Sequence, residues 1–312
     1  MDTLRVGIVG LGHLGTYHCQ KYARLPGCRI VGVADLVAER AQKAADQYGC
    51  MAFRDCRNLL QEGVDAVSIA VPTAAHYEVA RTCLAAGVDV LLEKPIASSL
   101  TEADDLVALA EAGGRVLQIG HIERFNPAIL ALDKVMGRPL FVEAHRLHPF
   151  FERGTDVDVV LDLMIHDLEI CLHFIQGGWA SVDAVGVPVL SDKVDIANVR
   201  ITFQSGCVAN ITASRVTSKT LQKIRFFGPE GYHAVDYGKR SLVSLRKDRD
   251  AEGRVAITDN RAEVVSHDPL EEEIRSFVQS VRERTRPVVS GRDGRDALAL
   301  AMTIVDKMKT GP

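Results

Sequence analysis

A glycine-rich turn near the start of the chain is the first candidate for binding chemistry. The segment Gly10-Leu-Gly12-His13-Leu14-Gly15 directly follows the apolar run 4–9. In a dinucleotide fold, the first glycine permits a tight turn, the second lets the backbone approach a pyrophosphate, and the third lets the next helix pack against the strand. Such turns also occur where no nucleotide binds. We predict that this one borders a dinucleotide, through Gly10, Gly12, His13, Leu14 and Gly15.

An acidic residue follows the turn at the distance that a dinucleotide fold requires. The run 29–34 reads as a second strand that ends on Asp35, twenty residues after Gly15. Its carboxylate could accept both ribose hydroxyls of an adenosine and would repel a 2′-phosphate, and no arginine follows to bind one. The sequence therefore favours NAD over NADP as the cofactor. The alternative is that Asp35 only caps the next helix.

A lysine at the end of another predicted strand could act as a base. The run 88–92 leads into Glu93-Lys94-Pro95. Lys94 could reach both a bound nicotinamide ring and a substrate hydroxyl. Partial burial and the positive ring would lower its pKa, so that it could accept a proton near neutral pH. From this motif alone a solvated lysine is the commoner interpretation.

An aspartate and a histidine four residues apart form the second candidate for proton transfer. Asp162 and His166 lie in a segment with helical spacing of apolar residues, so their side chains would share one helix face. The carboxylate could orient the imidazole and raise its basicity. A surface ion pair is an equal alternative. A metal site would need further ligands, and His145 and His148 are expected on opposite faces of a strand, so we predict no metal.

The first 122 residues contain the elements that must position the turn and the lysine. Apolar strand-like runs at 6–9, 30–34, 66–71, 88–92 and 116–119 alternate with helical patterns at 37–48, 74–86 and 101–112. Alternation of this kind, with strands that are apolar throughout, is typical of a parallel sheet covered on both faces. We expect an α/β fold whose first domain, residues 1–122, is a doubly wound parallel (Rossmann) sheet.

The rest of the chain predicts a second domain whose strands have a different pattern of apolar and polar residues. Strand-like runs at 140–147, 181–190, 197–203, 208–214 and 223–227 alternate apolar and polar side chains, and helical patterns follow at 270–284 and 292–308. Such strands pack one face on a core and leave the other partly exposed. We expect residues 123–312 to form an α+β domain for substrate binding and oligomerisation, with a large, mostly antiparallel open sheet. Its final helix could pack back on the first domain.

Composition excludes several classes of partner. The chain has 312 residues and a formal net charge of −4, whereas nucleic acids and anionic membranes call for a strongly basic surface. Seven cysteines without a Cys-x-x-Cys pair indicate a reducing compartment. The first strand begins almost at residue 1, which leaves no room for a signal peptide, and no apolar run approaches the roughly 20 residues that span a bilayer. We expect a cytoplasmic protein.

Together these motifs resemble the Gfo/Idh/MocA family of NAD(P)-dependent sugar oxidoreductases, and the resemblance runs nearly end to end. It is carried by the glycine turn, by Glu93-Lys94-Pro95 and by the Asp162/His166 pair. The resemblance implies that Lys94 and His166 are the catalytic candidates and that Asp162 supports them. It also implies further residues around the cofactor, namely Val71, Pro72, Thr73, His76, Glu93 and His121.

A narrower resemblance concerns the substrate. The segment 120–127, which contains Arg124 and Phe125, together with Asp162 to Asp167, resembles a bacterial subgroup that oxidises nucleotide sugars for surface polysaccharide or lipid A precursors of lipopolysaccharide. The resemblance gives no role to Asp167. The best-known activity of that kind oxidises the 3-hydroxyl of UDP-N-acetylglucosamine. Arginine forks suit diphosphates, and we expect substrate contacts from Lys94, Arg124, Phe125, Arg146, Arg153, Asp162 and His166. The alternative is that two of the three arginines are ordinary surface residues.

The resulting interpretation is a reversible dehydrogenase that passes a hydride from a secondary sugar hydroxyl to NAD while Lys94 or His166 removes the proton. Two other functions stay open: a dehydrogenase of inositol or a free sugar, and a non-enzymatic NAD- or sugar-binding regulator. The family resemblance implies a homodimer or homotetramer. An aminotransferase could consume the keto-sugar product.

Overall fold

The chain divides into two compact units. The computed structural model describes residues 3–150, 157–249, 255–262 and 267–309. The first unit comprises Met1–Ile122 and Asp268–Arg295, and the second comprises Glu123–His267 and Asp296–Pro312. The sequence predicts a single domain over 123–312, whereas the structure gives the segment 268–295 to the first unit. Apolar periodicity marks a buried helix face but does not say which sheet that face covers.

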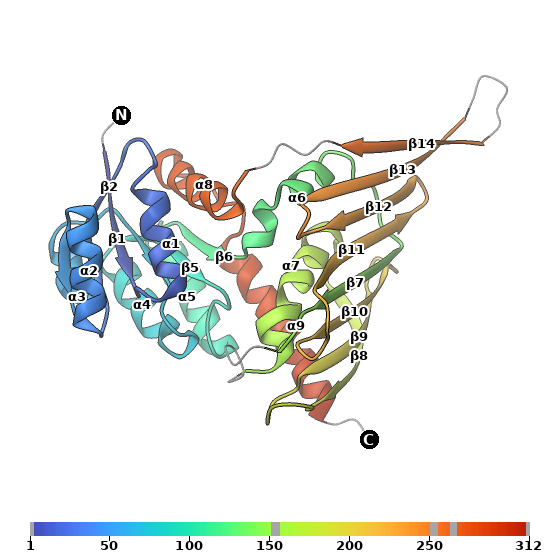
Figure 1. Ribbon diagram of the computed structural model, residues 1–312, viewed down its shortest axis with the longest axis horizontal. Helices are drawn as coiled ribbons and strands as arrows, with labels where there is room; N and C mark the ends of the chain where they lie inside the picture. Colours follow the sequence, from blue (N-terminus) through green and yellow to red (C-terminus); the bar gives the residue numbers. More distant parts are fainter. Residues whose placement is uncertain (1–2, 151–156, 250–254, 263–266, 310–312) are drawn as a thin grey trace. The chain divides into compact units, whose positions relative to one another are not determined.

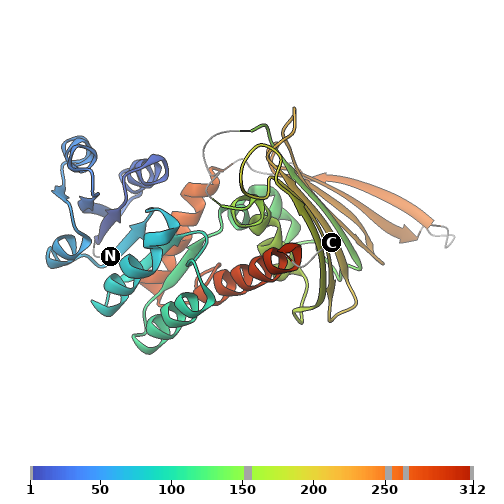
Figure 2. The same ribbon diagram turned by 90° about the horizontal axis from the view of Figure 1, so that it is seen from below.

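The first unit is built on a six-stranded sheet, and the parallel arrangement that the sequence predicted is confirmed. The strand order is β3-β2-β1-β4-β5-β6, and every neighbouring pair is parallel. Helices lie on both faces of this sheet (Figures 1 and 2). The strands are β1 (Leu4–Val9), β2 (Cys28–Ala34), β3 (Met51–Phe53), β4 (Ala66–Ile69), β5 (Asp89–Glu93) and β6 (Leu117–Gly120). The helices are α1 (His13–Tyr22), α2 (Ala38–Tyr48), α3 (Cys56–Gln61), α4 (His76–Ala85), α5 (Leu100–Ala112) and α8 (Pro269–Glu283), with a 3₁₀ turn at Thr73–Ala75.

Burial and capping explain most of these elements. All four residues of β4 and the first four of β5 are buried, as expected for strands covered on both faces. Ser99 and Glu102 form a reciprocal capping box at the start of α5. β3 and α3 were not predicted, because each is too short for a periodic apolar pattern to be recognised.

Helix α8 completes the core of the first unit. Its buried apolar residues Leu270, Ile274, Phe277, Val278 and Val281 belong to the same hydrophobic cluster as the strands and α1. Asp268 caps the helix by accepting hydrogen bonds from the backbone N–H groups of residues 270 and 271, and it also pairs with Lys21 of α1 at 2.7 Å. The segment therefore belongs to the first unit through both its apolar face and its cap.

The second unit carries a sheet of eight strands, and the prediction of a large, mostly antiparallel sheet is confirmed. The strand order is β14-β13-β12-β11-β7-β10-β9-β8, and only the pair β7 and β10 is parallel. The strands are β7 (Phe141–Leu147), β8 (Trp179–Val187), β9 (Ile196–Phe203), β10 (Val208–Ser214), β11 (Leu221–Gly228), β12 (Gly231–Asp236), β13 (Ser241–Arg249) and β14 (Val255–Ala262). The helical segments are a 3₁₀ turn (Ile122–Phe125), α6 (Pro127–Leu132), a π-helical turn (Val160–Met164), α7 (Ile165–Phe174) and α9 (Gly291–Lys309), of which residues from 296 onward belong to this unit.

One face of this sheet forms the core of the second unit. Inward side chains such as Val142, Ala144, Ile211 and Ile224 pack in one hydrophobic cluster with residues of α6, α7 and α9. Figure 2 shows these helices on one face, and among the described residues no helix of this unit covers the other face. The sheet is therefore open on one side. Across the described part of the chain, no helix is both long and apolar enough to cross a membrane.

Candidate functional site

The glycine turn connects β1 to α1 at the point where the strand order of the first sheet reverses. Ligands of open α/β sheets bind in the crevice at this switch point. Gly10 has a φ of +88°, and a Cβ added there would lie 2.6 Å from the carbonyl oxygen of Ala70. A Cβ on Gly15 would lie 1.8 Å from the carbonyl oxygen of Gly10, whereas a Cβ on Gly12 would meet no described atom within 4 Å. Two glycines are thus required by the turn itself, and the third leaves an open space at the start of α1.

The different surroundings of Gly12 and Gly15 predict opposite behaviour on substitution by alanine. Gly15→Ala is expected to lower the free energy of unfolding by about 1–3 kcal/mol, because backbone must move to admit the methyl group. Gly12→Ala is expected to leave stability within about 0.5 kcal/mol of the wild type but to weaken dinucleotide binding, because the methyl group occupies the space that a pyrophosphate would approach. Urea unfolding and calorimetric titration with NAD+ measure the two effects. Equal losses of stability would contradict this division of roles.

Asp35 directly follows β2, and its carboxylate lies beside the glycine turn. One carboxylate oxygen accepts a hydrogen bond from the Leu11 N–H at 2.6 Å and the other from the Val37 N–H at 2.8 Å. These bonds fix the carboxylate beside the glycine turn, and each oxygen keeps further acceptor capacity. Val37, not Asp35, is the N-cap residue of α2.

A hollow of about 510 Å³ lies beside the glycine turn, between α1 and α2. It is lined by Leu11, Gly12 and His13 from the turn and includes Arg40 and Lys43 of α2. Arg40 follows Asp35 by five residues. The expectation that no arginine accompanies Asp35 therefore omitted a cation on the next helix, since helical winding, and not sequence adjacency, brings Arg40 to the hollow.

The turn formed by Lys94 and Pro95 is held against the loop after β4 by contacts of the His76 ring. Lys94 comes directly after β5, and its peptide bond to Pro95 is cis. The buried His76 ring lies between two carbonyl oxygens, with Nδ1 2.7 Å from Pro95 O and Nε2 3.0 Å from Val71 O. Burial lowers the pKa of His76, so the ring tends to be neutral and then donates to one carbonyl at a time. Of the residues predicted around a nicotinamide, the structure thus brings Val71, His76 and the Lys94–Pro95 turn together.

Glu93, the residue before Lys94, contacts α1. Its Oε1 lies 3.1 Å from Nε2 of His18, whose Nδ1 lies 2.9 Å from the Ser68 hydroxyl oxygen of β4. His18 is almost completely buried. His18 was not among the predicted site residues, although a histidine in the first turns of a helix that starts at a glycine turn is a signal for one.

In the second unit, Asp162 and His166 lie in successive turns of one helical segment. Asp162 is in the π-helical turn and His166 in the first turn of α7, and both are partly exposed. The sequence analysis expected regular α-helical spacing, which a π-helical turn widens. Such turns are frequent at functional sites.

Arg146 and Asp167 form a buried ion pair in the second unit. The guanidinium donates to both oxygens of Asp167, at 2.8 and 3.1 Å, and its third nitrogen donates to Glu123 at 2.9 Å. The Tyr237 ring lies 4.6 Å from the guanidinium carbon. Although burial alone lowers the pKa of Arg146, the carboxylates of Asp167 and Glu123 raise it well above its ordinary value. Asp167, for which the sequence suggested no role, is thus the bidentate partner of a charged, buried arginine.

Arg124 is also bound to an internal carboxylate. Its Nη1 donates to Glu169 at 2.7 Å, and both side chains are nearly inaccessible to solvent. Phe125 and His121 are about 1% exposed. Arg153 lies outside the described residues. The two described arginines that were expected to meet a diphosphate are therefore committed to acidic partners within the same unit.

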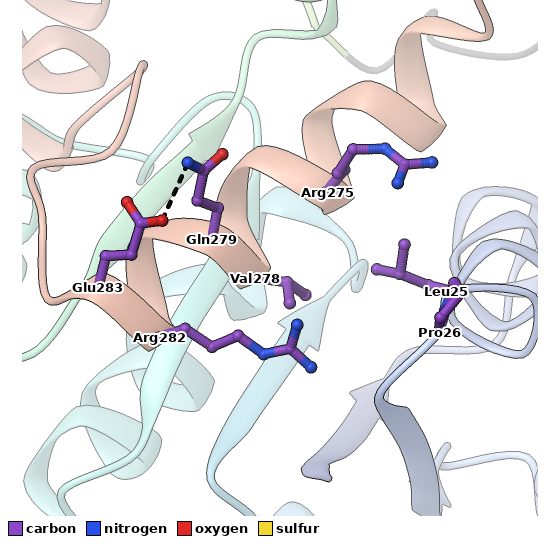
Figure 3. Close-up of a pocket in the computed structure, with 7 residues that line it drawn as sticks. All are labelled: Leu25, Pro26, Arg275, Val278, Gln279, Arg282 and Glu283. Atoms are coloured by element: carbon purple, nitrogen blue, oxygen red, sulfur yellow. Dashed lines mark hydrogen bonds between the residues drawn. The ribbon is translucent and has the colours of Figure 1, made fainter. Parts of the chain in front are cut away.

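A further pocket, of about 600 Å³, lies between α8 and the loop before β2 (Figure 3). None of the predicted site residues lines it. Arg282 donates to the backbone oxygen of Gly27 at 2.7 Å, and Gln279 donates to Glu283 at 3.1 Å, as the dashed line in Figure 3 shows. The polar groups of this pocket thus pair with one another or with neighbouring residues of the same unit, and we assign the pocket no part in the site.

Family models match both units. The model described as "oxidoreductase family, NAD-binding Rossmann fold" matches residues 4–121, and the "GFO/IDH/MocA C-terminal domain" matches residues 130–233. The first match makes residues 4–121 an NAD-binding Rossmann fold, in agreement with the glycine turn and Asp35.

Individual relatives cover nearly the whole chain. UDP-N-acetylglucosamine 3-dehydrogenase of Acidithiobacillus ferrooxidans is 39% identical over 306 residues, which is 97% of each protein. A solved structure of that enzyme has a TM-score of 0.92 and 38% identity and covers 99% of both chains. Myo-inositol 2-dehydrogenase of Thermotoga maritima is 25% identical and covers 95% of this chain and 94% of its own. A levoglucosan dehydrogenase in complex with NADH and L-sorbose shares the fold, with a TM-score of 0.88 at 19% identity over 99% of this chain and 97% of its own.

Proposed function

Because the chain belongs to the Gfo/Idh/MocA family of oxidoreductases, we propose that it oxidises the 3-hydroxyl of UDP-N-acetylglucosamine to a keto-sugar with NAD+. The observation that carries the substrate is the 39% identity, over 97% of both chains, to an enzyme of that name. The geometry supports the reaction class independently. The glycine turn and the Lys94 turn both belong to the first unit, on the sheet of the NAD-binding fold. The glycine turn leaves an open space at Gly12, and the Lys94 turn is held by the contact between His76 and Pro95 O.

The residues of the first unit fit the cofactor. The turn at Gly10, Gly12 and Gly15 would present backbone N–H groups to the pyrophosphate, and Asp35 would accept the ribose hydroxyls. When bound, NAD+ supplies the hydride acceptor. Asp35 favours NAD over NADP by charge repulsion of a 2′-phosphate, while Arg40 on α2 works in the opposite direction.

Proton removal is assigned to Lys94 or His166. A neutral Lys94 would take the proton of the reacting hydroxyl, and His166, oriented by Asp162, would polarise that hydroxyl or take the proton instead. Val71, Pro72, Thr73, His76 and His121 would border the cofactor. We propose that Arg124 and Arg146 hold the helix that carries Asp162 and His166, and that Arg153 is the arginine that contacts the diphosphate.

We further propose a cytoplasmic homodimer or homotetramer that uses the open face of the eight-stranded sheet. That face carries half-buried side chains such as Phe141, Leu147 and Phe227, which a second copy could cover. In the cell, an aminotransferase would consume the keto-sugar, in a route to lipid A precursors of lipopolysaccharide.

Turnover on a panel of substrates tests the proposed function. The purified protein is expected to reduce NAD+ with UDP-N-acetylglucosamine and to be stabilised against heat by that sugar when NAD+ is present. UDP-glucose, free N-acetylglucosamine, myo-inositol and NADP+ serve as comparisons, and mass spectrometry of the product would show the loss of two hydrogens. Turnover on inositol or free sugars alone would favour the alternative dehydrogenase. NAD+ binding without turnover on any of them would favour a regulator.

A further inference from the structure

Three ionisable side chains gather in the interior of the first unit, next to the Lys94 turn. His18 of α1, Glu93 at the end of β5 and Glu273 of α8 each place a ring nitrogen or carboxylate oxygen within 4.8 Å of the other two. His18 is 1% exposed and Glu273 is 0% exposed. The proton transfer proposed above makes no use of His18 or Glu273. We call these three residues the buried carboxyl cluster.

Glu93 is held within this cluster on a defined side. Its Oε1 lies 3.1 Å from His18 Nε2. Its Oε2 lies against β6, where a Cβ added to Gly120 would be only 3.0 Å away. The absence of a side chain at Gly120 leaves room for the carboxylate, and the position of Glu93 is thus fixed by α1 and by β6 together.

Glu273 completes the cluster from α8. Among the described residues, neither of its carboxyl oxygens has a hydrogen-bond partner, although its backbone oxygen accepts from Gln118 of β6 at 3.0 Å. A buried carboxylate without donors is costly, and the neutral acid is much less so. Burial, and then the charge of Glu93, raise the pKa of Glu273 well above its ordinary value.

Two hydroxyl groups, those of Ser68 and Tyr22, extend the cluster beyond His18. Ser68 of β4 contacts His18, and the Tyr22 hydroxyl of α1 lies 3.3 Å from the Ser68 oxygen. Burial raises the pKa of Tyr22, so its hydroxyl stays neutral. Within the cluster itself, His18 is the one basic group, opposite two carboxyl groups.

We propose that Glu273 is a positioning residue for the dehydrogenase: as a neutral carboxylic acid it donates its O–H toward Glu93 and, through Glu93, fixes the backbone that carries Lys94. A neutral Glu273 can donate a hydrogen bond to the carboxylate of Glu93 without adding a second negative charge to the cluster. Lys94 follows Glu93 directly, so a shift of Glu93 moves Lys94 relative to the substrate. The role of Glu273 rests on the proposed function, since it acts on Lys94, one of the two candidate bases of that reaction.

Replacing Glu273 separates a hydrogen-bonding role from a packing role. Glu273→Leu removes the donor but keeps the volume, and it is expected to lower kcat about 10- to 100-fold by misplacing the base, with the KM for NAD+ changed less than about twofold. Glu273→Gln keeps a neutral donor and is expected to restore most of kcat. Glu272→Gln, a partly exposed acid on the same helix, is the matched control and should behave as the wild type. If Glu273→Leu keeps full kcat, or if Glu273→Gln loses as much as Glu273→Leu, Glu273 does not position the base.

A spectroscopic readout is independent of turnover. The infrared difference spectrum between the wild type and Glu273→Gln at pH 7 is expected to contain the C=O stretching band of a protonated carboxyl group. Its absence would overturn the proposal even if the enzyme is active. One divalent cation per chain, found by elemental analysis of the wild type and lost in Glu273→Gln, would overturn it too, because a metal and not a proton would then balance the two carboxylates. Failure of every sugar to turn over, with the band present, would refute the proposed function alone.

Discussion

Replacing Lys94 by methionine is expected to lower the rate of NAD+ reduction by about 10²–10⁴-fold, the contribution that a positioned general base makes. Lys94 is partly exposed at the end of β5, and its turn is tied to the loop after β4 through His76. Methionine keeps much of the length and apolar stem of the side chain, so the turn should remain in place. NAD+ should still bind, because the glycine turn and Asp35 are unchanged.

Single-turnover kinetics with UDP-N-acetylglucosamine, combined with calorimetric titration of NAD+, measure this effect. Lys193→Met, which removes an exposed lysine of the β8–β9 loop, controls for the loss of one positive charge. His166→Asn is the informative counterpart, because the two residues are the competing candidates for the base. A full single-turnover rate in Lys94→Met would transfer the role of the base to His166, and a full rate in His166→Asn would leave it with Lys94.

The fold could be predicted where a segment with a periodic apolar pattern is long enough for the pattern to be recognised. Strands β1, β2, β4, β5 and β6 and their parallel arrangement follow from the alternation of buried strands with amphipathic helices, whereas the strand order comes from the structure. The strands β12, β13 and β14 were not identified, and neither was the membership of α8 in the first unit. Half-exposed strands give a weaker apolar pattern in the sequence. The apolar face of a helix also does not show which of two sheets it packs against.

The candidate site could be predicted as far as motifs determine it, but the partners of its charged residues could not. From the sequence, Arg146 is expected to be a cation available to a phosphate. In the structure its guanidinium instead donates two hydrogen bonds to Asp167, which is 21 residues away in the chain. The sequence pattern does mark Glu273 as unusual. It falls on the apolar face of α8 with Leu270, Ile274 and Phe277, at helical spacing, where a carboxylate is unusual.

Replacing Asp167 by asparagine is expected to lower the free energy of unfolding of the second unit by about 3 kcal/mol, near the lower end of the 3–5 kcal/mol typical of a broken buried ion pair. Asp167 is 0% exposed and binds Arg146 through two hydrogen bonds. The neutral amide can accept only one of them, and the guanidinium cannot give up its proton. Glu123 still pairs with Arg146 at 2.9 Å, which keeps the loss from being larger. Denaturant unfolding followed by the fluorescence of Trp179, the one tryptophan of the chain, reports on this unit.

The same sheet provides a matched control for this prediction. Arg225 and Glu143 form an ion pair at 2.7 Å on neighbouring strands, but both side chains are more than 30% exposed. Solvent screens such a pair, so Glu143→Gln should cost less than about 1 kcal/mol. The double variant Asp167→Leu with Arg146→Met should recover part of the stability that Asp167→Leu loses alone, because no unpaired charge then stays buried. If Asp167→Asn costs no more than Glu143→Gln, the arginine is not confined to its internal carboxylates and is available to a phosphate after all.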